Sequence, residues 1–175
     1  MQFSKDSFYM ALHDRLAVVN PLRTVTVDGA TRPAVVVAEN EPVGATESLR
    51  DTFYLWWGTA VPLKGHSEGK RPLFAMECAI FYHSEGTADD GSDRGRALAQ
   101  LDLELLQMGS PAYVAKQDFT QATPQSLGTN VLWTRPEMDA LTAKDLELSR
   151  RGNAENDVWR KAKVMVFFYP EVDLP

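Results

Sequence analysis

The sequence predicts an α+β fold: a mostly antiparallel β-sheet of about four to five strands, with two helices packed on one face and long loops. Three observations support this fold class. A strand-like segment at 73–83 is followed by a helix-like segment at 94–108, a helix-like segment opens the chain, and an apolar strand-like segment closes it at 158–169. We expect residues 1–175 to form a single domain.

The segment 73–83 has the alternation of a strand with one covered face. Successive side chains of a strand point to opposite faces of the sheet. One face carries only apolar or aromatic side chains, namely Phe74, Met76, Cys78, Ile80 and Tyr82. The other face is mixed and includes Glu77 and His83. This pattern is typical of an antiparallel sheet that packs on helices with one side only.

The segment 94–108 has the spacing of a helix buried on one side. Its apolar residues recur at intervals of three, four and three, at Leu98, Leu101, Leu105 and Met108. Ser92 or Asp93 is the expected N-cap, because a short oxygen side chain accepts hydrogen bonds from the free N–H groups of a first turn. Gly109 is the expected stop.

The opening helix is expected to start at Ser4 or Ser7 and to end at Asn20, because the residue before Pro21 disfavours helical backbone angles. Its apolar residues recur at intervals of four, four and three, at Phe8, Leu12, Leu16 and Val19. This spacing predicts a helix with one side in the core.

Two short strands, Thr24–Val27 and Ala34–Ala38, are predicted to pair as a β-hairpin. Asp28-Gly29 between them readily adopts the positive φ angles of a tight turn. Pro33 precedes the second strand, where a proline is tolerated.

The rest of the chain gives weaker signals. The aromatic run 52–57 is expected to form a strand beside 73–83, and two short β-prone patches occur at 112–115 and 130–133. Polar residues, glycines and prolines dominate around them. We therefore expect long loop insertions at about 39–72 and 113–156.

Composition and charge exclude several classes of protein. A net charge of −6 argues against a general nucleic-acid binder, which needs a basic face to displace phosphate counterions. Cys78 is the single cysteine and lies in an apolar strand, so we expect a packing thiol and a reducing compartment. We find neither a signal-peptide pattern nor the ~20-residue apolar run that spans a bilayer, and expect a soluble protein made in the cytoplasm.

No residue is predicted to be catalytic or to bind a cofactor or metal, so we do not expect an enzyme. The histidines, His13, His66 and His83, fall in different elements, and the paired Cys/His spacing of a zinc site is missing. The acidic turn 89–93 lacks the ligand order of a calcium loop. Neither a phosphate-binding loop nor a serine nucleophile motif occurs in the sequence.

The order and character of these elements resemble the tail terminator (tail completion) proteins of long-tailed bacteriophages, in particular the lambda type. Four features carry the likeness: the opening helix 8–19, the strand pair across Asp28-Gly29 with its Arg32-Pro33-Ala34-Val35 run, the strand and helix at 73–83 and 94–108, and the final strand 164–169. The two predicted loop insertions depart from the family pattern.

The resemblance implies a structural protein of the virion. Copies of the chain are expected to form a ring, a hexamer in that family, that caps the tail tube and joins it to the head or neck. The implied partners are the chain itself, the tail tube protein and a neck or connector protein. DNA is met only as it passes through the lumen, and the implied location is the tail and neck of the virion, with no membrane partner.

Four aromatic residues are candidates for subunit or tube contacts: Tyr54, Trp56, Trp57 and Trp133. Tryptophan and tyrosine are enriched at the centres of interfaces. The alternative for the same residues is packing in the core or the sheet. Two other functions stay open, a head–tail neck or connector protein, and a small-ligand-binding or enzymatic α+β domain whose aromatic run lines a pocket.

Overall fold

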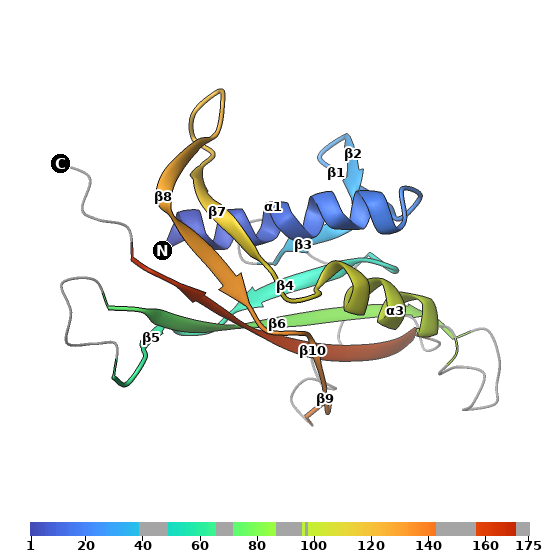
Figure 1. Cartoon of the computed structure of the whole chain (residues 1–175). Coiled ribbons are helices and arrows are strands. Elements are labelled where there is room, and N and C mark those ends of the chain that lie inside the picture. Colours follow the sequence, from blue (N-terminus) through green and yellow to red (C-terminus); the bar gives the residue numbers. More distant parts are fainter. Residues whose placement is uncertain (39–48, 66–71, 87–95, 97, 143–156, 171–175) are drawn as a thin grey trace.

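The computed structural model describes residues 1–38, 49–65, 72–86, 96, 98–142 and 157–170 (Figure 1). Within these ranges the protein is an α+β fold, as predicted. Helices α1 (Gln2–Val19) and α3 (Ala99–Met108) lie on the same side of one large sheet. We call this side the inner face and the side away from the helices the outer face.

The sheet is larger than predicted and has mixed strand directions. Its eight strands run in the order β3-β4-β6-β10-β8-β7, with β5 beside β6 and β9 beside β10. Their bounds are β3 Val35–Val37, β4 Phe53–Trp57, β5 Val61–Pro62, β6 Phe74–Glu85, β7 Tyr113–Asp118, β8 Gln125–Trp133, β9 Glu137–Asp139 and β10 Asp157–Phe168. Only the β3–β4 pair is parallel among the pairs described.

The two predicted loop insertions therefore contain strands. β4 and β5 lie within 39–72, and β7, β8 and β9 lie within 113–156. The expected strand at 52–57 is confirmed as β4, which pairs antiparallel with β6. The prediction of four to five strands was wrong because the added strands are short or edge strands with a weak sequence pattern.

The centre of the sheet is the antiparallel pair of β6 and β10. Their twelve-residue registers match from Asp157 opposite Glu85 to Phe168 opposite Phe74. This pairing confirms the two long predicted strands to within two residues at each end. Met76, Cys78, Ile80 and Tyr82 point to the inner face and are buried, so Cys78 is a packing thiol.

The first strand of the predicted hairpin pairs with a different strand from the one predicted. β1 (Thr24–Val27) pairs with β2 (Ala30–Pro33), with Val27 opposite Ala30. Asp28 and Gly29 form the two-residue turn, at φ angles of 49° and 79°. The predicted partner, Ala34–Ala38, was wrong because such a short turn brings Ala30, not Ala34, opposite the first strand. Residues 35–37 instead form β3, whose three valines are all buried.

The two helices are confirmed, but their starts are not where predicted. α1 begins at Gln2, so Ser4 and Ser7 lie inside the helix, and the Ser7 hydroxyl donates a hydrogen bond to the Phe3 carbonyl at 2.6 Å. In α3 and the turn before it, the four apolar positions 98, 101, 105 and 108 are buried, as predicted. The expected cap at Ser92 or Asp93 lies outside the described residues.

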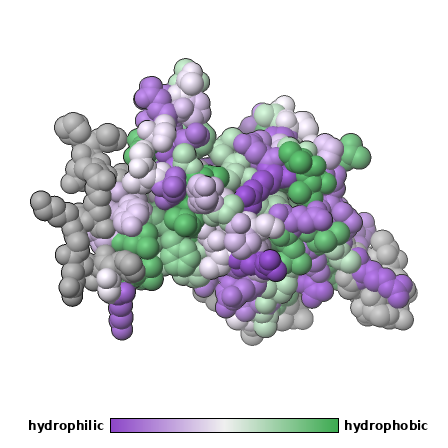
Figure 2. Space-filling model, in the orientation of Figure 1, coloured by the Kyte–Doolittle hydropathy of each residue, from purple (hydrophilic) through white to green (hydrophobic). Residues whose placement is uncertain are grey.

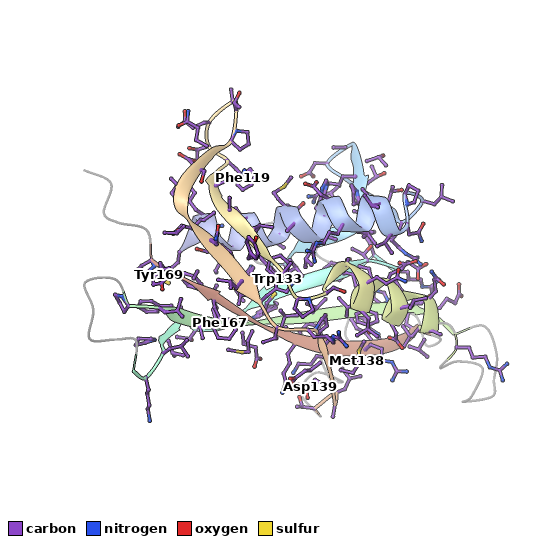
Figure 3. All side chains as sticks on the ribbon, viewed as in Figure 1. Phe119, Trp133, Met138, Asp139, Phe167 and Tyr169 are labelled. Atoms are coloured by element: carbon purple, nitrogen blue, oxygen red, sulfur yellow. The ribbon has the colours of Figure 1, made fainter. Side chains whose placement is uncertain are left out.

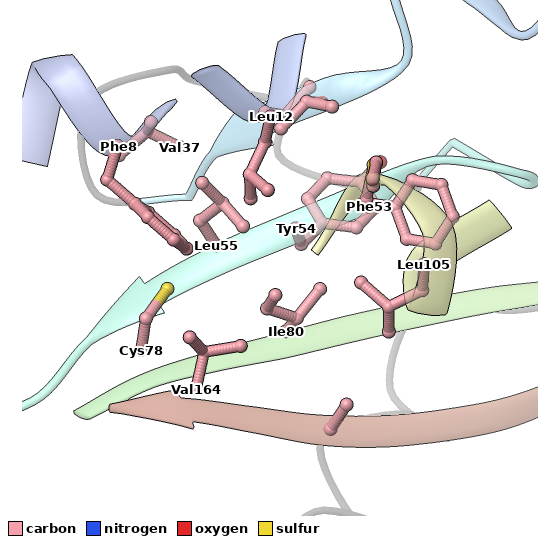
Figure 4. Packing of buried hydrophobic residues seen from close by; sticks show 14 of the residues in the cluster. Phe8, Leu12, Val37, Phe53, Tyr54, Leu55, Cys78, Ile80, Leu105 and Val164 are labelled. Carbon is pink, nitrogen blue, oxygen red and sulfur yellow. The ribbon is translucent and has the colours of Figure 1, made fainter. Parts of the chain in front are cut away.

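The core lies between α1, α3 and the inner face of the sheet (Figure 4). Phe8 and Leu12 descend from α1 toward Leu55 of β4, and Leu105 of α3 packs over Ile80 of β6. The core is one continuous cluster that reaches from β3 to β8. Both helices are therefore held to the sheet by apolar contacts, which fixes the directions of their solvent-facing sides.

Candidate assembly surfaces

The four predicted interface aromatics separate into three buried residues and one exposed residue. Trp57 of β4 and Trp133 of β8 are buried and contact the Phe8 ring edge-on at 5.5 and 5.3 Å. Tyr54 is also buried, and its hydroxyl is bonded to both the N–H and the carbonyl of Leu49. The surfaces of these three side chains are covered within this chain, which favours the alternative of packing in the core. Trp56 is 56% exposed.

The outer face around Trp56 carries charges that pair with one another. Trp56 lies opposite Ala79, which lies opposite Lys163. Lys163 is 3.7 Å from Glu137 of β9, in the same row. In the next row Lys161 is 3.8 Å from Asp139 of β9. Trp56 is thus an exposed ring near two ion pairs, Lys163–Glu137 and Lys161–Asp139.

A second part of the outer face is free of charge. One residue from each of five strands stands in register across the sheet, in the order Tyr113, Leu132, Phe167, Ala75 and Val61. We call this set the apolar row. Tyr113 is 70% exposed, and Leu132 and Val61 are also exposed, while Phe167 is half-buried on β10 (Figure 3). Ala75 is buried. Exposed apolar side chains that gather on one face in this way are typical of an interaction surface.

α3 has an unusual distribution of polarity. Its exposed side carries Ala99, Leu103 and Leu106, spaced four and three apart, which we call the leucine stripe. Leu103 is 49% exposed. Figure 2 shows hydrophobic side chains over α3 and over the nearby end of α1. The two acidic residues of the helix turn the other way: Asp102 accepts a hydrogen bond from the Tyr82 hydroxyl at 2.6 Å, and Glu104 is fully buried.

The buried carboxylate of Glu104 is surrounded by donors. Arg23 donates from Nε and Nη2 at 2.8 and 3.1 Å, Asn20 donates at 2.6 Å, and Gln100 donates at 3.0 Å. Burial raises the pKa of Glu104, but the hydrogen bonds from these three residues outweigh it and hold the pKa below its usual range. The cluster ties the end of α1 to α3 and so fixes the direction of the leucine stripe.

A second buried polar cluster lies where the C-terminal end of β6 pairs with the N-terminal end of β10. His83 is fully buried, with Nδ1 3.1 Å from Asp157 and its ring stacked on Trp159 at 4.1 Å. Arg50 binds Asp157 and Glu85, each at 2.8 Å. An imidazole that is covered on all sides cannot reach a substrate, so this cluster is a structural tie. No group of three possible metal-ligating side chains occurs in the described part of the chain.

The His83 cluster predicts a pH dependence of stability. Burial lowers the pKa of His83 below 6.5, more than the Asp157 and Asp51 carboxylates raise it, and the Arg50 guanidinium lowers it further. As the pH falls below 6.5, His83 therefore binds a proton in the unfolded chain before it does so in the folded chain. We expect the free energy of unfolding to fall between pH 7.5 and 5.5, by at most about 1.4 kcal/mol per pH unit for this one group.

Urea unfolding at several pH values checks this slope. His83→Gln should flatten it, while His13→Gln, which changes a histidine paired with the exposed Asp14 on α1, should leave it intact. An equal slope in the wild type and in His83→Gln would show that the cluster does not titrate as expected.

The comparisons with known proteins add no relative. No protein-family model matches this chain, and no curated protein matches it. Neither described helix combines the length and apolar character needed to cross a membrane. The candidate surfaces therefore rest on the residues and geometry given above.

Sequence reasoning missed the apolar row and the leucine stripe. Tyr113 and Leu132 are nineteen positions apart in the chain and meet only through the β7–β8 register. The stripe does have a sequence signal, since Glu104 falls at the buried spacing between Leu101 and Leu105 while Leu103 and Leu106 fall opposite. That signal indicates a helix whose outer side is apolar.

Proposed function

We propose that this protein is a structural subunit of virion assembly, similar to a tail terminator, whose copies close into a ring that caps the tail tube and joins it to the head or neck. The observation that carries the proposal is a pair of uncharged apolar surfaces on one chain, the apolar row and the leucine stripe. Ring closure needs two different patches on each subunit, because every contact is head-to-tail.

The exposed aromatic and leucine side chains can supply part of the area of a subunit contact. An aromatic side chain offers about 150–250 Å², and three aromatic rings, Trp56, Tyr113 and Phe167, face the outer side. With the leucines they expose an area on the order of several hundred Å², against about 800 Å² per partner in a standard interface.

The element order also supports the proposal. Three of the four features on which the family resemblance rests are present: the opening helix, the long central strand with its helix, and the closing strand. In the fourth, the hairpin, the second strand is Ala30–Pro33. The proposal is favoured over an aromatic-lined pocket because Tyr54, Trp57 and Trp133 are packed inside the chain.

Native mass measurement and negative-stain electron microscopy test the proposal. We expect a closed ring of identical subunits, a hexamer, in purified protein. A species that stays monomeric at all accessible concentrations would refute it.

Trp56→Ala tests the role of the exposed tryptophan in the ring. Trp56 lies on the outer face two rows from the apolar row, and we expect the contact to reach it. The ring dissociation constant should then rise by at least about tenfold, since a tryptophan hot spot contributes about 2 kcal/mol or more, while stability changes by less than about 0.5 kcal/mol. Sedimentation over a range of concentrations measures the first effect. Lys163→Ala, in the same row, is the matched control and should assemble normally; equal assembly of Trp56→Ala and wild type would remove Trp56 from the contact.

A further inference from the structure

We propose that the leucine stripe of α3 docks across the apolar row of the next copy of the chain. This inference rests on the proposed ring and names its two contacting surfaces. The occupant of the apolar row is thus a second copy of this protein, and the contact is between a helix and the outer face of a sheet.

The inverted polarity of α3 is the first argument. The helix turns both acidic side chains inward, where Glu104 needs three donor residues to offset its burial, and turns Leu103 and Leu106 to solvent. The exposed positions of α3 are Ala99, Gln100, Leu103, Leu106 and Gln107, and none of them is charged. Depletion of charge is the compositional mark of an interface core.

The apolar row matches the stripe in character and length. Ala99 to Leu106 spans about 10 Å at 1.5 Å per residue. Tyr113 to Phe167 crosses two strand spacings, also about 10 Å. The row is likewise uncharged. The next row of the outer face pairs Met165 with the exposed Glu77, and the Lys163–Glu137 and Lys161–Asp139 pairs lie in the two rows after it. The stripe can therefore lie along the row while the Glu77 carboxylate stays at the solvent-exposed margin of the contact.

The geometry favours this pairing over contact between two identical faces. The stripe lies on the helix side of the sheet and the row lies on the outer face, so they are presented on different sides of the chain. Two rows facing each other would close a dimer and leave both stripes exposed. A stripe on a row leaves one free stripe and one free row, which is what a growing ring requires.

A mixing experiment with two variants tests the inference. The stripe variant is Leu103→Asp with Leu106→Asp, and the row variant is Tyr113→Asp with Leu132→Asp. All four residues are exposed, so we expect both variants to fold, which circular dichroism checks. Each variant alone should be monomeric. An equal mixture should give a dimer of one copy of each, because only one intact contact can form.

Three outcomes would contradict the inference. If the wild type forms rings and the mixture stays monomeric, the stripe and the row do not meet, and the proposed ring survives. If either variant alone still forms rings, its surface is not part of the contact. If the wild type itself is always monomeric, the proposed function fails and this inference fails with it.

Disulfide trapping gives a second readout that does not depend on charged substitutions. Leu106→Cys and Leu132→Cys, each made singly, should form a cross-linked dimer under mild oxidation only when the two proteins are mixed. Cys78 does not interfere because it is buried. Cross-linking of Leu132→Cys with itself, or no cross-linking in the mixture, would overturn the assignment.

Discussion

Replacing Arg23 by alanine should lower the free energy of unfolding by about 3 kcal/mol, because it leaves the buried Glu104 carboxylate without its charged partner. Arg23 reaches both carboxylate oxygens, at 2.8 and 3.1 Å. Asn20 and Gln100 remain as neutral donors, which places the effect at the lower end of the range for a broken buried pair. Urea unfolding at pH 7 and fixed protein concentration measures the loss.

Lys163→Ala is the control for this prediction. Its salt bridge to Glu137 is 3.7 Å long and exposed, so its removal should cost less than about 1 kcal/mol. The double variant Arg23→Met, Glu104→Leu removes both charges, and we expect it to recover most of the lost stability. Equal effects of Arg23→Ala and Lys163→Ala would mean that the buried pair is not what fastens α3.

The sign of the pH dependence follows from the same contacts. The hydrogen bonds hold the pKa of Glu104 below its ordinary 4.5, so their contribution to stability is present above that pH and is lost as the pH falls through the lowered value. Assembly should weaken together with this loss, because Glu104 fixes the orientation of the leucine stripe. The ring should therefore dissociate over the same pH range in which the Glu104 cluster loses its contribution to stability.

The sequence predicted the parts of the fold that carry a long, regular pattern. The buried sides of α1 and α3 and the strands β6 and β10 each place several regularly spaced apolar residues on one side, so spacing alone located them. The side-chain contacts between these elements did not follow from spacing. Arg23 and Glu104 are far apart in sequence, and no local pattern links them.

The short elements and the candidate surfaces depended on register. β5 and β9 have two and three residues, too few to show alternation. Trp56 and Trp57 are adjacent, and only the pairing of β4 with β6 decides which of them enters the core. A shift by one residue would exchange them. The apolar row likewise exists only after five strands are aligned, which explains why the sequence pointed to four aromatic residues of which three are buried.

Phe8→Ala should be the most destabilising change of all, at about 3–5 kcal/mol, because it opens a cavity where α1 meets the sheet. Phe8 is fully buried between the rings of Trp57 and Trp133, which belong to strands on opposite sides of the β6–β10 pair. For a chain of this length the loss corresponds to a fall in Tm of roughly 10 °C. Thermal unfolding followed by near-ultraviolet circular dichroism reports both the midpoint and the packing of the two tryptophans.

Trp56→Ala is the matched control, because it removes a larger aromatic ring from an exposed position on the sheet against which Phe8 packs. Its Tm should stay within a few degrees of the wild type, although its ring assembles poorly. Phe8→Ala should have a lower Tm than the wild type. Below that Tm it should still assemble, because the apolar row and the leucine stripe remain in place. If Phe8→Ala unfolds at the wild-type temperature, the three-ring cluster is not the junction of α1 with the sheet. If Trp56→Ala lowers Tm as strongly as Phe8→Ala does, Trp56 is a core residue, and the separation of core aromatics from surface aromatics that underlies the proposed ring contact is wrong.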